Sequence, residues 1–81
     1  MRVLKEIPHS SCRITLFEWN NRYLIKLERG LLEQTFKVNV YDVADEAELL
    51  GIIDEAFVAE SVQLFQAMER CLHAARERAV K

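Results

Sequence analysis

Residues 13–40 read RITLFEWNNRYLIKLERGLLEQTFKVNV, and this stretch decides the fold. In residues 13–19 and again in 22–28, β-branched and aromatic side chains alternate with polar ones, and this two-residue period predicts β-strands. Asn20 and Asn21 stand between the two segments. Asn tolerates the positive φ that both positions of a two-residue type I′ turn require. We therefore predict an antiparallel hairpin, which a third strand extends.

The two-residue loop fixes which residues face each other across this hairpin. A slip by one residue would move every side chain to the other face, so the sorting of side chains tests the register. One face collects only apolar and aromatic side chains near its centre, and the other gains an expected Arg13–Glu28 ion pair. The remaining pairs are Trp19 with Arg22, Phe17 with Leu24, Thr15 with Lys26, Glu18 with Tyr23, Leu16 with Ile25 and Ile14 with Leu27.

The second turn is predicted at Arg29-Gly30, because glycine adopts the backbone conformation that a tight loop needs. A two- or a four-residue loop keeps the same parity, whereas a three-residue loop would place charged side chains on the apolar face, so we reject it. Gln34 is then the one polar member of that face in the third strand. This turn pairs Leu27 with Leu32, Tyr23 with Phe36 and Lys26 with Glu33, and it adds Leu32, Phe36, Val38 and Val40 to the apolar face.

The size of the chain limits the possibilities. It has 81 residues, of which 51% are hydrophobic, and a net charge of −2, which fits a single domain over residues 1–81. A domain of this size buries about 60–65% of its unfolded surface, so its stability is marginal and oligomerisation is expected. No apolar run approaches the ~20 residues of a membrane span, and no signal peptide is evident. We expect a cytoplasmic protein.

The N-terminal segment, residues 1–12, has two interpretations. Val3, Leu4 and Ile7 alternate with charged side chains, which favours a short edge strand. Pro8 would end that strand, because proline cannot donate to a ladder. A flexible tail is the alternative.

The composition becomes helical after residue 40. We predict a short helix over 44–53, weakened by Gly51, and a long helix over 55–78 with Asp54 as its N-cap. One stripe of the long helix should cover the apolar sheet face. The fold class is therefore α+β, a three- or four-stranded antiparallel meander (13–40) followed by a helical half (44–79). The stripe comprises Phe57, Ser61, Leu64, Phe65, Met68, Cys71, Leu72 and Ala75.

Acidic residues crowd the first part of this helical half. No basic residue lies between Lys37 and Arg70, whereas Arg76 and Arg78 follow near the C-terminus. An acidic patch for a basic partner is one interpretation. Acidic side chains at helix N-termini and basic ones at C-termini also complement the helix dipole, and we favour this explanation.

Catalytic and metal chemistry are not favoured. Cys71 and His73 point about 200° apart on a helix, so they cannot easily share an ion, and Cys71 is expected in the core. His9 is expected in a loop, and a disulfide between Cys12 and Cys71 does not suit a cytoplasmic chain. No glycine-rich phosphate loop is present. We therefore expect no catalytic residue, no cofactor and no metal.

The sheet face turned away from the helices is the best candidate for function. Phe17 and Leu24 are paired near its middle, and Trp19 stands by the first turn, among charged side chains. Exposed apolar patches usually mark interaction surfaces, and aromatic residues are favoured anchors. We expect a non-catalytic domain that forms a homodimer or binds another protein through this face. The candidate interface comprises Phe17, Trp19, Leu24, Arg22, Lys26 and Thr35.

The alternative is binding of single-stranded nucleic acid, with bases stacked on Phe17 and Trp19. In the order of its elements, strands followed by a helix, the expected fold resembles the whirly-type and PUR-type nucleic-acid modules, and this resemblance is one of topology only. The pI of about 5.6 disfavours this alternative. An accessory protein that neutralises a partner is a third interpretation, and the sequence alone does not determine the function.

Overall fold

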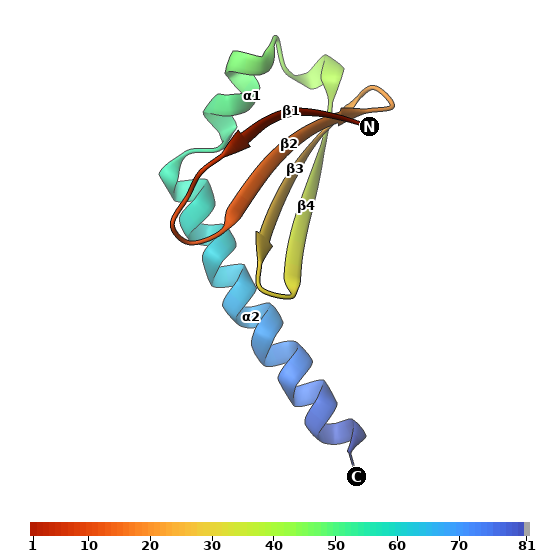
Figure 1. Ribbon diagram of the computed structural model, residues 1–81, viewed down its shortest axis with the longest axis vertical. Helices are drawn as coiled ribbons and strands as arrows, with labels where there is room; N and C mark the ends of the chain where they lie inside the picture. The colour runs from red at the N-terminus through yellow and green to blue at the C-terminus, as the bar shows by residue number, and fades with distance from the viewer. Residues whose placement is uncertain (81) are drawn as a thin grey trace.

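The sheet has four antiparallel strands in the order β1-β2-β3-β4, so each strand pairs with its neighbour in the sequence. The computed structural model describes residues 1–80 and confirms the predicted fold class (Figure 1). Two helices follow the sheet and cover one of its faces. The strands are β1 (Arg2–Ile7), β2 (Arg13–Trp19), β3 (Arg22–Arg29) and β4 (Leu32–Asn39).

The β2–β3 hairpin has the predicted register at all seven pairs, from Arg13 with Glu28 to Trp19 with Arg22. Asn20 and Asn21 adopt φ angles of 57° and 61°, as a type I′ turn requires. This turn twists in the same sense as the strands it joins. The hairpin therefore places the apolar side chains of both strands on one face.

The β3–β4 register differs from the prediction by two residues. The turn is formed by Gly30 and Leu31 rather than by Arg29 and Gly30, so Arg29 pairs with Leu32. Gly30 has a φ of 60° and Leu31 has no positive φ, as in a type II′ turn with glycine first. A shift by two residues keeps every side chain on its predicted face, so only the partners change. The corrected pairs are Leu27 with Gln34, Tyr23 with Val38 and Lys26 with Thr35.

The N-terminal segment forms the edge strand β1 and is not a tail. Ile7 pairs with Ile14 and Val3 pairs with Phe17, and the register shifts by one residue between Val3 and Lys5. The shift lets Leu4 pack against the core, together with Ile7. β1 thus contributes to both faces of the sheet.

Both helices begin at aspartate N-caps. Asp45 caps α1 (Glu46–Ile52) and Asp54 caps α2 (Glu55–Ala79), and each side chain accepts a hydrogen bond from a backbone N–H three residues on. The predicted cap of the long helix is confirmed, and a short 3₁₀ turn, η1 (Val40–Asp42), links the sheet to α1. Within residues 1–80, neither helix combines the length and the apolar character needed to cross a membrane.

The core lies between the sheet and the helices. Phe65 of α2 and Leu49 of α1 are fully buried there. At the β4 side, the rings of Phe36 and Phe57 lie 5.1 Å apart in a tilted arrangement. The other buried members of this cluster are Cys12, Ile14, Leu16, Ile25, Leu27 and Val58.

The C-terminal half of α2 is not covered, which corrects the prediction that the whole stripe is core. Leu72 is about half exposed there, and Cys71 is exposed instead of buried. Leu64, in the first half of the helix, is about half exposed as well. Figure 1 shows the reason: α2 continues well past the turn between β3 and β4 and has no sheet beneath its last turns. The molecule is accordingly elongated, with extents of 51 × 26 × 19 Å.

Gln34 is the polar residue of β4 on the covered face, and only one of its two side-chain polar atoms has a hydrogen-bond partner. Its Nε2 donates to the backbone oxygen of Ser61 at 2.9 Å, whereas its Oε1 is buried without a partner. A buried unpaired oxygen costs more than a single hydrogen bond contributes. We expect Gln34→Leu to raise the free energy of unfolding by about 1 kcal/mol in urea denaturation. Thr35→Val on the opposite face is the control, and a loss of stability in Gln34→Leu would contradict this explanation.

Candidate interaction surface

The face of the sheet opposite the helices, here called the open face, is built from rows of paired side chains. Val3, Phe17 and Leu24 form one row, which Lys37 completes on β4. In the next row, toward the β2–β3 turn, Trp19 pairs with Arg22, and Arg22 pairs in turn with Asn39 on β4. The apolar row therefore crosses the sheet next to the tryptophan.

The six residues predicted for this surface all lie on the open face, but they differ in exposure. Trp19 is 49% exposed and Phe17 is half-buried, whereas Leu24 is only 7% exposed. The burial of Leu24 differs from the expected exposed anchor. The reason is that Met1, Phe17 and Lys26 surround it at a small hollow of about 190 Å³. Of the polar members, Arg22 and Thr35 are exposed and Lys26 is half-buried.

Two further apolar residues belong to this surface, although the sequence did not predict it. Val3 and Met1 are both exposed, and β1 places Val3 opposite Phe17. The alternation in residues 2–7 predicted the strand, but a terminal edge strand can be added in either register. Its contribution to the open face therefore became visible only with the pairing.

The charges of the open face are partly neutralised within the chain. Arg13 Nη2 donates a hydrogen bond to Glu6 Oε1 at 2.8 Å, and Lys26 Nζ lies 3.4 Å from Glu33 Oε2. The bond to Glu6, with the charges of Glu6 and Glu28, raises the pKa of the Arg13 guanidinium. Arg13 and Glu28 are cross-strand neighbours, as predicted. The ion pair of Arg13, however, is formed with Glu6 and not with Glu28.

Arg22 and Lys37 are the cations next to the aromatic side chains. Both are exposed, and within residues 1–80 neither takes part in an ion pair. They lie on the rows of Trp19 and Phe17, so a positive rim borders the exposed part of the apolar row. An apolar centre with a charged rim is the usual anatomy of an interface.

No family model, no curated protein and no solved structure matches this chain.

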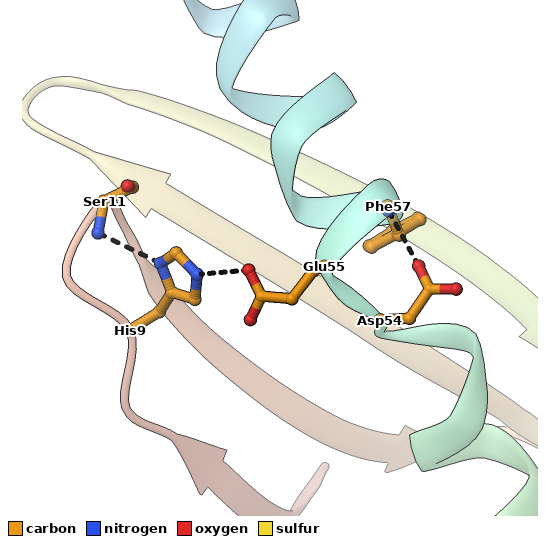
Figure 2. A network of polar contacts seen from close by, with 5 residues as sticks. All are labelled: His9, Ser11, Asp54, Glu55 and Phe57. Carbon is orange, nitrogen blue, oxygen red and sulfur yellow. Dashed lines mark hydrogen bonds and ion pairs between the residues drawn. The ribbon is translucent and has the colours of Figure 1, made fainter.

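The histidine of the β1–β2 loop joins this loop to the start of α2 (Figure 2). The backbone N–H of Ser11 donates to His9 Nδ1 at 3.0 Å, and His9 Nε2 lies 3.7 Å from Glu55 Oε2. Because Nδ1 accepts a bond, the neutral ring carries its proton on Nε2, facing Glu55. His9 thus connects the β1–β2 loop with the first turn of α2. The neighbouring Asp54 side chain caps α2 by accepting a hydrogen bond from the backbone N–H of Phe57.

A hollow of about 690 Å³ lies beside this loop and the end of β3. Glu6 and Glu28 line it together with Arg13 and Arg29, so its charge is mixed. Arg29 Nη1 is buried without a hydrogen-bond partner. Within residues 1–80, no three His, Cys, Asp or Glu side chains lie close enough to hold a metal ion. The hollow thus offers neither a ligand set nor a charge of one sign.

The two cysteines are free and have different surroundings. Cys12 is buried, whereas Cys71 is exposed on α2. Burial raises the pKa of the Cys12 thiol, and the nearby charge of Arg29 opposes this effect to a lesser extent. Cys12 is therefore a protonated core side chain at neutral pH.

A thiol reagent should distinguish the two cysteines. At pH 8 we expect rapid modification of Cys71 and protection of Cys12 in the folded chain, with both reacting in denaturant.

The folded state binds the Cys12 proton more tightly than the unfolded state does, so the free energy of unfolding should fall as the pH rises above about 9. Cys12→Ala should lack this contribution. Equal rates for both thiols in the native protein would contradict the burial of Cys12.

Proposed function

We propose that this protein is a non-catalytic association domain whose open face binds a partner protein. The observation that carries the proposal is the exposure of Trp19, which stands beside Phe17 and next to the unpaired cation Arg22 on a sheet face that no helix covers. Tryptophan and arginine are the residues most enriched among binding hot spots. Trp19 and Arg22 form one cross-strand pair on this surface.

The chemistry of the surface favours a partner of a particular kind. Arg22 and Lys37 need anionic groups, and the apolar row needs a complementary apolar side chain or pocket. A partner segment with a central hydrophobic residue flanked by Asp or Glu meets both needs. A homodimer through the same face is less well supported, because Leu24 is buried and the two copies would bring like charges together.

Two further observations support a binding role over catalysis. Cys12, a potential nucleophile, is buried, and His9 is engaged with Ser11 and Glu55 rather than with a nucleophilic side chain. Nucleophilic catalysis requires a base within reach of the nucleophile and a third group that orients the base. The free thiols suit the cytoplasm, where disulfides are rare.

Single-stranded nucleic acid is the second candidate ligand. The specific observation in its favour is that Trp19 lies on the same face as Arg22 and Lys37, an arrangement that suits a stacked base and its phosphates. The net charge of −2 weakens long-range attraction to nucleic acid. A protein partner is therefore the better-supported proposal.

A photo-cross-linking side chain tests the proposal in the intact cell. We expect benzoylphenylalanine in place of Thr35, which is exposed on the open face, to give discrete adducts with another protein. The same group in place of Gln66, on the polar side of α2, is the matched control. Adducts with a second copy would indicate a homodimer through this face, and adducts removed by nuclease would indicate nucleic acid. Identical adduct patterns from both positions, or none from Thr35, would overturn the proposal.

A further inference from the structure

A second uncovered apolar surface lies on α2, on the opposite side of the sheet from the open face. It consists of two neighbouring ridges, which we call the α2 seam: a large ridge, Leu64-Met68-Leu72, and a small ridge, Ala67-Cys71-Ala75. Leu64 and Leu72 are 52% and 51% exposed. Leu32 of β4 lines the same groove, which has a volume of about 550 Å³.

The tip of the β3–β4 turn extends this surface. Leu31 is fully exposed there, although it is one of the more hydrophobic residues, and it lines a hollow shared with Leu72. The last turns of α2 extend beyond the sheet (Figure 1). Helical segments without tertiary packing are marginal in water, so an amphipathic helix end gains stability when its apolar side is covered. Large exposed apolar patches usually mark interaction sites.

We propose that a second copy of this chain covers the α2 seam, with the two α2 helices packed antiparallel about a two-fold axis. In this arrangement the large ridge of each helix packs on the small ridge of the other. Leu64 then lies opposite Ala75, and Met68 lies opposite Cys71 of the second copy. A surface that carries a large and a small ridge side by side is self-complementary under two-fold symmetry, as an isologous dimer requires.

The charges of α2 select the antiparallel orientation. The large ridge continues to Glu60 at one end and to Arg76 at the other, each four residues from a ridge leucine. In the antiparallel pair, Glu60 comes opposite Ala79 of the second copy, next to its Arg78. A parallel pair would instead place Glu60 beside Glu60 and Arg76 beside Arg76. Within residues 1–80, no ion pair involves Glu60, Arg76 or Arg78, so all three remain available.

The size of this contact predicts a weak dimer. Residues 60–79 form about 30 Å of helix, and a helix is about 10 Å wide, so each copy buries on the order of 300 Å². Contacts from Leu31 and Leu32 add to this area. The total falls below the lower end of specific interfaces, which bury about 1,200 Å² or more. We therefore expect dissociation at micromolar concentrations.

Chemical cross-linking tests the orientation. With Met68 opposite Cys71, the Cys71 side chains of the two copies lie about 4.5 Å apart along the helix direction, across a helix spacing of about 8–10 Å. A short bis-maleimide should therefore join two Cys71 side chains of the folded wild-type chain into a covalent dimer. In the control, Cys71→Ser with Gln66→Cys moves the thiol to the polar side of the same helix. Equal cross-linking of the two proteins would overturn the proposal.

Sedimentation velocity gives the second readout. Leu72→Glu places a charge in both symmetric contacts and should raise the dimer dissociation constant at least about 30-fold. Gln66→Glu makes the same kind of change on the polar side and should leave the constant unchanged, and circular dichroism checks that both variants are folded. A wild-type monomer at several hundred micromolar would overturn the proposal. The open face lies on the other side of the sheet, so this result leaves the proposed partner site untouched.

Discussion

Phe65→Ala should lower the free energy of unfolding by about 3–5 kcal/mol, the largest loss expected from a single truncation in this chain. Phe65 is fully buried and belongs to the same cluster as the buried residues of β2, β3 and α1. Removing its ring forfeits the transfer free energy and leaves a cavity that the surrounding strands cannot fill. Small domains have total stabilities of about 5–15 kcal/mol, so the variant should be partly unfolded at moderate temperature.

Leu64→Ala is the matched control for Phe65→Ala. The two positions are adjacent on α2, but Leu64 is half exposed beside the sheet. Its truncation in the monomer should cost about 1 kcal/mol or less, because roughly half of the side chain is in water already. Urea denaturation followed by circular dichroism measures both variants. Similar losses at the two positions would mean that α2 does not present Phe65 to the sheet.

Trp19→Ala should weaken binding of the partner captured through Thr35 by at least about 30-fold, because hot-spot truncations cost about 2 kcal/mol or more. The side chain is half exposed in the free protein, so its loss should change the stability by much less than that of Phe65. Fluorescence anisotropy of a labelled partner segment would measure the dissociation constant.

Two controls separate a binding role of Trp19 from a general surface effect. Trp19→Phe keeps an aromatic ring and should retain most of the affinity. Tyr41→Ala removes an aromatic side chain that is more exposed than Trp19 but lies in η1, outside the strands that form the open face. An unchanged affinity in Trp19→Ala, or an equal loss in Tyr41→Ala, would contradict the assignment of the open face.

The hairpin from Arg13 to Glu28 could be predicted residue by residue because two independent signals agree there. The Asn20-Asn21 pair fixes the turn, and the alternation on both sides fixes the faces. The N-cap at Asp54 was predictable for a similar reason, since a capping side chain precedes a long amphipathic stretch.

The β3–β4 register could not be fixed in the same way. A two-residue shift leaves every side chain on the same face, so the apolar pattern does not distinguish Arg29-Gly30 from Gly30-Leu31. Hydrophobicity favoured the wrong choice, because the observed turn exposes Leu31 completely. The exposure of this leucine becomes reasonable if it adds to the α2 seam.

The sequence also could not reveal how far the core extends along α2. The stripe from Phe57 to Ala75 keeps one period throughout, and the periodicity of a helix does not reveal where the sheet beneath it ends. The structure places that limit near Phe65 and Met68, which leaves Cys71 outside. On the open face the same limitation appears at Leu24, whose burial depends on β1 and Met1 beside it.

The indole N–H resonance of Trp19 gives the most direct test of the proposal that the open face binds a partner. The chain contains one tryptophan, so this signal needs no assignment strategy. Addition of the captured partner to ¹⁵N-labelled protein should shift or broaden the indole signal together with the amide of Thr35. The amide of Leu72, on the α2 seam, should be unaffected at constant protein concentration. An indole signal that stays in place at saturating partner would contradict the account.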